Sequence, residues 1–183
     1  MRDAISLSKQ TTQVDQRPWI QVSFDPTYPL QARHAPGGIL HIVNNGKTPA
    51  TDIDGHFSIE TVQNGVQPRL DYNGRGVVAT VGTLFPNDPK PIPIVRQRNL
   101  PMEGITVIGD IPAVDDPLTP EEIQSVDNVA IFFVTYGTVS YKDFFGTKHE
   151  TKFCAFWRTP ANIGLAVSAR KCTDYNRIDT NPN

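Results

Sequence analysis

Two aspartates and a histidine at alternate positions of one predicted strand have side chains that could do chemistry. Asp52, Asp54 and His56 share one face of the segment 51–60, spaced about 7 Å apart. Carboxylate and imidazole groups bind divalent cations, so a metal site, and with it a metal-dependent hydrolase, is one hypothesis. Ligands on a single strand lie in a line, however, whereas a metal ion needs them to converge from several directions. The pattern therefore predicts a solvated polar face and no metal site.

A second polar group, near residue 149, has the residue types of an acid–base pair. His149 and Glu150 follow the connection Lys142–Lys148, with Asp143 on its other side, so a base beside an orienting carboxylate is conceivable. No GxSxG elbow and no nucleophile in a recognisable context accompany them. The segment 73–76 (NGRG) resembles a phosphate-binding loop only in its glycines, because no βαβ unit surrounds it. We therefore predict ordinary hairpin and turn residues, with no catalytic residue and no cofactor.

The two cysteines, Cys154 and Cys172, allow two interpretations. A bridge would close a loop of about 18 residues and stabilise the fold by about 3 kcal/mol on the chain-entropy model. Alternatively both are reduced, and one is buried as a small apolar side chain. The sequence does not show whether their Cα atoms lie within the separation of about 7 Å that a bridge requires. Both interpretations remain open, but two cysteines without a CxxC motif are too few for a structural zinc site unless histidines contribute.

Aromatic residues mark the strongest structural signal, the segment 129–157. Two stretches rich in Val, Phe, Tyr and Thr flank a short connection that holds Asp143 and Gly146, which predicts an antiparallel β-hairpin. Most of its aromatic side chains are expected to pack in the core or across the hairpin. If Phe144 and Phe145 are exposed at its tip, they form an apolar patch suited to a partner.

The elements that must position these residues are mostly short strands. Alternating apolar residues predict that the segments 19–24 and 51–60 are strands with one face in the core and the other in water. Thr119, Pro120 and Glu122 form the capping box of a short helix over 119–126. Further strands are expected at 39–43, 77–85 and 105–108, a turn at 44–46, and a rigid, partly extended loop at 86–93.

Composition and spacing together predict an all-β protein with an immunoglobulin-like antiparallel β-sandwich and one short crossover helix. The 183 residues suit one domain at 17–179, between a polar helical segment at 1–16 and a tail at 180–183. The 16 prolines favour short strands, edges and loops over long helices. The net charge is −2 with interspersed signs, which excludes a nucleic-acid-binding stripe. No apolar stretch of membrane-spanning length and no signal peptide is present, so we expect a soluble chain.

Three segments resemble a known group of proteins: QRPWI at 16–20, VNNGKTPA at 43–50 and YKDFFGTKHETKFC at 141–154. The group consists of small bacterial membrane-anchored proteins of unknown function. They carry one or two N-terminal transmembrane helices, a polar juxtamembrane helix and a β-rich domain. The resemblance implies that residues 5–16 are a remnant of the juxtamembrane helix and that the hairpin and both cysteines belong to the domain core. It supplies no catalytic residues, and this chain lacks the membrane helix.

These observations favour a non-enzymatic binding or sensing domain, tethered to a bacterial membrane in the intact gene product. The expected partner is a protein or a small molecule, and the cysteines favour the extracytoplasmic side. One alternative is a soluble interaction protein of the immunity or inhibitor type. The other is a metal-dependent hydrolase that uses the Asp52–His56 face.

Overall fold

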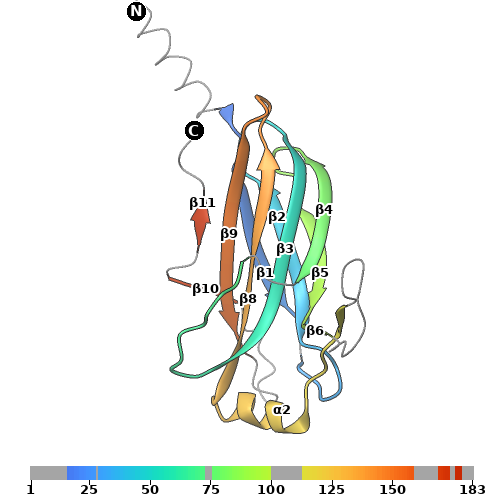
Figure 1. The fold of residues 1–183 in the computed structure, drawn as a ribbon, viewed down its shortest axis with the longest axis vertical. Helices are drawn as coiled ribbons and strands as arrows, with labels where there is room; N and C mark the ends of the chain where they lie inside the picture. Colours follow the sequence, from blue (N-terminus) through green and yellow to red (C-terminus); the bar gives the residue numbers. More distant parts are fainter. Residues whose placement is uncertain are drawn as a thin grey trace, which may run out of the picture.

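The computed structural model describes residues 16–27, 29–72, 76–99, 113–158, 169–173 and 176–178, and all structural statements refer to these. They form two antiparallel sheets packed face to face as an immunoglobulin-like β-sandwich, as the sequence predicts (Figure 1). The smaller sheet has the order β1-β2-β5, with β1 at Ile20–Pro26, β2 at Gly37–Asn44 and β5 at Lys90–Val95.

The larger sheet has six strands in the order β10-β9-β8-β3-β4, and β11 also pairs with β9. Its strands are β3 (Ala50–Gln63), β4 (Val77–Leu84), β8 (Ile131–Lys142), β9 (Lys148–Trp157), β10 (Arg170–Lys171) and β11 (Arg177–Ile178). A separate two-stranded ladder joins β6 (Gln97–Asn99) to β7 (Ala113–Asp115). The expected strand at 105–108, the segment 73–75 and the expected tail at 180–183 lie outside the described residues.

The core between the sheets follows the predicted alternation. In β1, Ile20, Val22 and Phe24 are buried, and in β3 the buried set includes Ile53 and Phe57. In the larger sheet, the indole of Trp157 in β9 stacks on the ring of Phe133 in β8, with centroids 4.7 Å apart. Across the interface between the sheets it contacts the ring of Phe24 in β1, with centroids 5.5 Å apart. Each aromatic side chain buries a large area, so this cluster joins the two layers.

The hairpin predicted at 129–157 is confirmed, and it lies inside the larger sheet. Strand β8 pairs with β3 on one side and β9 on the other. Gly146 has φ of 80°, the left-handed conformation that a turn of this length needs. The turn predicted at Asn44–Gly46 is also present. A Cβ on Gly46 would clash with the carbonyl oxygen of Arg17, so close backbone packing requires glycine at this position.

The helix α2 (Pro120–Asp127) begins at the predicted capping box. Thr119 Oγ1 accepts from the backbone N–H of Glu122 at 3.1 Å, and Glu122 Oε2 accepts from the N–H of Thr119 at 2.9 Å. The helix leads directly into β8 and closes one end of the sandwich (Figure 1).

The expectation of a loop at 86–93 is wrong from Lys90 onward, because β5 pairs with β2 along six residues. Pro91 and Pro93 obscured this strand in the sequence. A strand at a sheet edge pairs along one side only, so prolines at alternate positions can point their missing N–H away from the ladder. β5 is such an edge strand.

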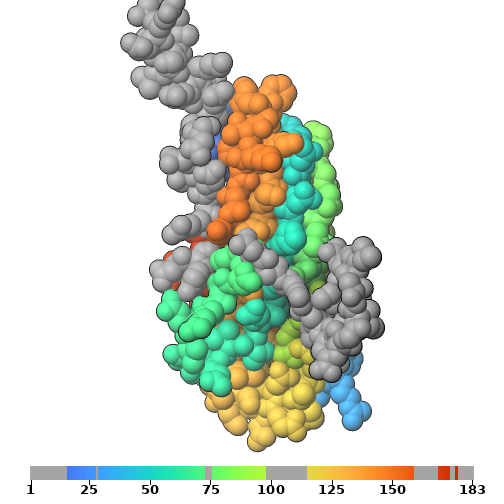
Figure 2. All heavy atoms as spheres, viewed as in Figure 1, coloured from blue at the N-terminus to red at the C-terminus, as the bar shows by residue number. Residues whose placement is uncertain are grey.

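The outer face of β3 over 51–60 is exposed or half-buried, as the alternation predicts. Toward the α2 end, a second apolar cluster lies on the outside of the larger sheet, built on Val62, Val134, Tyr136 and Cys154. The segment after β3 covers part of this face and contributes Leu70 and Tyr72 (Figure 2). The larger sheet is therefore buried on both sides over part of its length.

Candidate functional site

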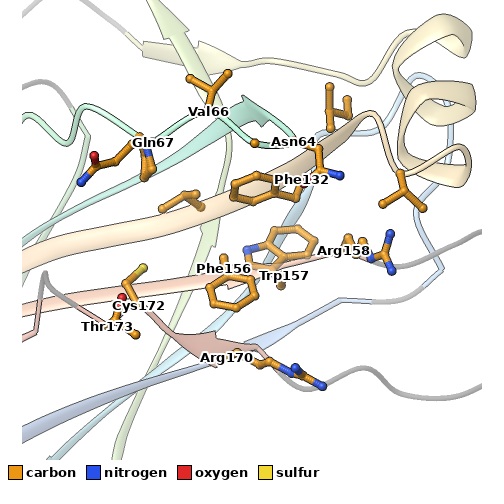
Figure 3. Close-up of a pocket in the computed structure, with 15 residues that line it drawn as sticks. Asn64, Val66, Gln67, Phe132, Phe156, Trp157, Arg158, Arg170, Cys172 and Thr173 are labelled. Atoms are coloured by element: carbon orange, nitrogen blue, oxygen red, sulfur yellow. The ribbon is translucent and has the colours of Figure 1, made fainter.

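An open groove of about 860 Å³ adjoins the outer apolar cluster at the α2 end of the larger sheet (Figure 3). One wall is the segment 64–68, which follows β3, and the other is the segment 170–173 around β10. The floor comes from the first residues of β8 and the last residues of β9. We call this the β8–β9 groove.

Strand register explains the floor. Val134 of β8 lies opposite Phe156 of β9, and Phe156 in turn lies opposite Arg170 of β10. The ring of Phe132 meets that of Phe156 edge to face, with centroids 6.2 Å apart. Phe156 remains 39% exposed and Val66, on the wall, remains 52% exposed. The floor is therefore a partly uncovered aromatic surface.

Two arginines flank this floor. Arg158 directly follows the end of β9 and lines the groove, and Arg170 is the cross-strand neighbour of Phe156. Arg158 Nη1 is buried, and no described residue accepts a hydrogen bond from it. A buried charged donor without an acceptor costs free energy. Among the described lining residues there is no Asp or Glu, so the groove is electropositive in a chain of net charge −2.

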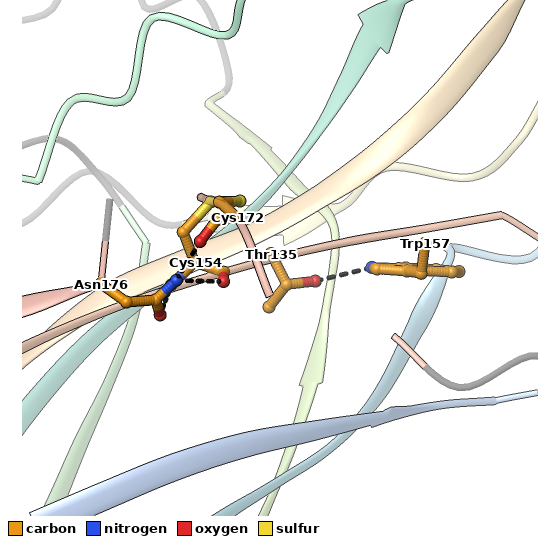
Figure 4. Close-up of a disulfide and its surroundings, with 5 residues drawn as sticks. All are labelled: Thr135, Cys154, Trp157, Cys172 and Asn176. Carbon is orange, nitrogen blue, oxygen red and sulfur yellow. Dashed lines mark hydrogen bonds between the residues drawn. A yellow bond between two sulfur atoms is a disulfide. The ribbon is translucent and has the colours of Figure 1, made fainter. Parts of the chain in front are cut away.

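The disulfide holds one wall of the groove against its floor. Cys154 and Cys172 are bonded, with Cα atoms 5.4 Å apart, which resolves the alternative that the sequence left open in favour of the bridge (Figure 4). The backbone N–H of Cys172 donates to the carbonyl of Cys154 at 3.0 Å. The side-chain amide of Asn176 donates to the carbonyls of both cysteines, at 3.2 and 2.8 Å, and its oxygen accepts from the N–H of Cys154 at 3.0 Å.

Val129 contributes a strained residue to the same groove. The helix α2 ends in a Schellman motif, in which Val129 N–H donates to the carbonyl of Val126 and Ala130 N–H to that of Ser125. Val129 occupies the position where glycine is usual, with φ of 63°, and is 41% exposed. A β-branched residue in this conformation costs on the order of 1–3 kcal/mol, and such strain concentrates at functional sites.

The predicted polar face of β3 is present only in part. Asp54 and His56 are exposed on it, but Asp52 has φ of 49° at a bulge, which interrupts the regular spacing. Asp52 pairs with Lys142 at 2.7 Å, and Asp54 accepts from Thr80 Oγ1 at 2.9 Å. Within the described part of the chain, no group of three or more His, Cys, Asp or Glu side chains is placed to hold a metal ion.

His149 and Asp143 do meet, as a buried pair inside the hairpin. His149 Nε2 lies 3.0 Å from Asp143 Oδ2, and their side chains are 2% and 7% exposed. Asp143 Oδ1 accepts from the N–H groups of Phe145 and Thr147, both at 2.8 Å. The two residues lie at the hairpin end, as predicted, and the structure adds that the pair is buried and organises the turn. Glu150 takes no part in it and lies 3.4 Å from Lys152.

The aromatic residues of the hairpin divide into two groups. Phe153 and Trp157 belong to the core, whereas Phe144 and Phe145 at the tip are 77% and 48% exposed. The tip patch that the sequence suggested is thus exposed.

A third charged cluster holds α2 in place. The guanidinium of Arg96 lies 2.7 Å from Glu122 and 3.0 Å from Asp116, and it also donates to Thr61 of β3 at 2.8 Å. The hydrogen bond from Arg96 lowers the pKa of Glu122 below its ordinary value. In the outer cluster, burial raises the pKa of Tyr136. The carboxylate of Glu60, which accepts a hydrogen bond from the Tyr136 hydroxyl, raises it further. Both pairs are part of the packing between elements.

Sequence reasoning missed the β8–β9 groove and its two arginines. Position 158 lies just beyond the end of β9 and position 170 lies in the two-residue strand β10, and no local pattern links them. The one available signal was the outward position of Phe156 beside Arg158.

The fold and the site together define a β-sandwich domain with a disulfide-braced, electropositive groove. Comparison with protein-family models, with curated proteins and with solved structures finds no match to this chain. None of the helices in the described residues has both the length and the apolar character needed to cross a bilayer.

Proposed function

We propose that this protein is a non-enzymatic binding domain whose ligand site is the β8–β9 groove. The single observation that carries the proposal is the buried Nη1 of Arg158, which has no acceptor among the described residues, beside an exposed aromatic floor. Guanidinium groups bind carboxylate and phosphate groups with paired hydrogen bonds. A groove of about 860 Å³ has the size of a small-molecule site. The ligand that fits this chemistry is a small amphiphilic anion, with its charge at Arg158 and Arg170 and its apolar body on Phe132 and Phe156.

The test uses 8-anilinonaphthalene-1-sulfonate, which joins an aromatic body to an anionic group, and measures its fluorescence on titration with protein. Arg158→Gln and Arg170→Gln should each weaken binding by about tenfold, because each removes a charge-assisted hydrogen bond. Arg69→Gln is the matched control, since Arg69 lies exposed on the same covering segment but does not line the groove. Decanoate should displace the probe more strongly than hexanoate does.

Circular dichroism of each variant separates a lost site from a lost fold. Equal affinities for the native protein, Arg158→Gln and Arg170→Gln would contradict the proposal, as would displacement that does not depend on chain length.

We further propose that the intact gene product is a bacterial membrane-anchored protein with this domain on the extracytoplasmic side. The support is the resemblance of the segments 16–20, 43–50 and 141–154 to such proteins, together with the disulfide. Disulfides persist in oxidising compartments and are rare in the cytosol. Fractionation of cells that express the full-length gene tests the anchor, and protease treatment of spheroplasts tests the side. Recovery in the cytosolic fraction with free thiols would contradict both.

A further inference from the structure

The tip of the β8–β9 hairpin is a convex surface with two neighbouring aromatic rings. Phe144 and Phe145 are 77% and 48% exposed, and their rings meet edge to face with centroids 5.8 Å apart. Large exposed aromatic side chains that lie together mark an interaction site. The tip lies at one end of the molecule, and α2 lies at the other (Figure 1).

The contacts of Asp143 within the hairpin hold the tip in one conformation. Asp143 accepts two backbone N–H groups of the turn and contacts the buried ring of His149. A buried charged group without partners would be costly, but here every contact of Asp143 fixes the turn. The two rings are therefore displayed by a rigid loop, and binding through them loses little conformational entropy.

The same end of the sandwich carries a further exposed ring. Leu84 of β4 lies opposite Ala50 of β3, and the next residue of β3, Thr51, lies opposite Lys142 of β8. The end of β4 and the hairpin tip therefore lie at the same end of the larger sheet, about two strand spacings, or about 10 Å, apart. Phe85, which follows β4, is 58% exposed.

Lysines flank the aromatic tip. Lys142 and Lys148 are directly opposite one another in the register at the base of the turn. Like charges in this position destabilise a sheet unless other groups compensate them. Asp52 neutralises Lys142 at 2.7 Å, whereas Lys148 is exposed and no described carboxylate pairs with it.

We propose that the hairpin tip binds the surface of an anionic lipid bilayer. Phe144 and Phe145 enter the interfacial region, where aromatic rings are favoured, and Lys142 and Lys148 lie at the level of the lipid phosphates. A bilayer can accept such a protruding tip without a surface of complementary shape, which a protein partner would have to provide. The inference depends neither on the groove nor on a membrane anchor.

The test is co-sedimentation of the protein with vesicles of phosphatidylcholine containing about one quarter phosphatidylglycerol. We expect binding that weakens by about tenfold in the double variant Phe144→Ser, Phe145→Ser. Lys148→Gln should weaken binding to the anionic vesicles but not to pure phosphatidylcholine. Raising the salt from about 0.05 M to about 0.5 M should weaken it as well, because screening shortens the range of the attraction. Val78→Ser is the matched control, since Val78 is 60% exposed on β4.

Three outcomes would overturn the inference. The first is no sedimentation of the native protein with anionic vesicles. The second is sedimentation that the double serine variant retains in full. The third is a native dimer that the double variant converts to monomer without any vesicle binding, which would assign the tip to contact between copies of the chain. Unfolding curves of the variants confirm that each is folded.

Discussion

At the scale of single residues, two buried charged side chains, Arg96 and Asp143, have specific partners from other elements. Arg96 joins the start of α2 to β3, and Asp143 joins the hairpin turn to His149. Arg158 differs, because its buried Nη1 has no acceptor among the described residues. We therefore assign Arg158 to ligand binding, whereas Arg96 and Asp143 stabilise the fold.

The Arg96–Glu122 pair predicts a pH dependence of stability. The pKa of Glu122 in the folded protein is held below its ordinary value of 4.5, mainly by the hydrogen bond from Arg96. The stabilisation is therefore complete above pH 4.5 and is lost as the pH falls through the lower, folded pKa. Glu122→Gln should lower the free energy of unfolding at pH 7 by about 1 kcal/mol, a modest value because the carboxylate is part-exposed.

Urea denaturation of both proteins between pH 7 and pH 3 measures this difference. The gap between native protein and Glu122→Gln should shrink toward the acid end. Glu121→Gln is the control, because Glu121 is exposed in the same first turn of α2. A gap that stays constant with pH would show that Glu122 acts through packing rather than through its charge.

At the scale of elements, the disulfide and the helix terminus both shape the β8–β9 groove. The bridge attaches the short strand β10 to β9, and the Schellman motif of α2 turns Val129 toward the opposite rim. Short elements with few hydrogen bonds contribute little stability alone. The positions of β10 and of the end of α2 therefore depend on the disulfide and on the Schellman motif.

Removal of the bridge should destabilise the protein. The bond spans 18 residues, so Cys172→Ala should lower the free energy of unfolding by about 3 kcal/mol. It should also weaken binding of the anionic probe, because the wall that carries Arg170 is released. Urea denaturation and the probe titration measure the two effects. Reducing agent should reproduce both in the native protein, and unchanged stability after reduction would show that the bridge does not constrain the unfolded chain.

Relief of the strain at Val129 should have opposite effects on stability and binding. Val129→Gly replaces a β-branched residue at φ of 63° and should raise the free energy of unfolding by about 1 kcal/mol. The same change removes an apolar side chain from the groove and should weaken probe binding. Thermal denaturation and probe titration report the two quantities. Lower stability in the variant would mean that the packing of the valine outweighs its backbone strain.

At the scale of the whole molecule, one core joins the two sheets into a single cooperative unit. Residues of both sheets contribute to the main apolar cluster, and the aromatic contacts of Trp157 cross the interface between them. Small domains with one core generally unfold in a single step.

We expect fluorescence and circular dichroism to report the same unfolding transition. In a Trp19→Phe background the emission comes from Trp157, between the sheets, while far-ultraviolet circular dichroism reports the strands of both. Urea midpoints should coincide. Separate midpoints would show that one sheet persists after the core opens, and the native protein serves as the reference for the effect of the background substitution.

Local patterns in the sequence determined most of the elements. Alternation predicted β1 and β3, aromatic and β-branched composition predicted the hairpin, and the capping box located the start of α2 to the residue. Each of these signals depends on contacts between residues close in the chain or on burial of one face. They fail at β5, where two prolines hide an edge strand, and at Asp52, where a bulge breaks the spacing.

Only the tertiary structure decided the features that bear on function. The β8–β9 groove unites segments near residues 66, 132, 157 and 171, and the outer apolar cluster exists because a covering segment and a disulfide meet on the same face. The contact of Asp143 with His149 depends on a turn that folds back over the strand end. Spacing along a chain does not encode such approaches, because sheet order and register determine which distant residues become neighbours.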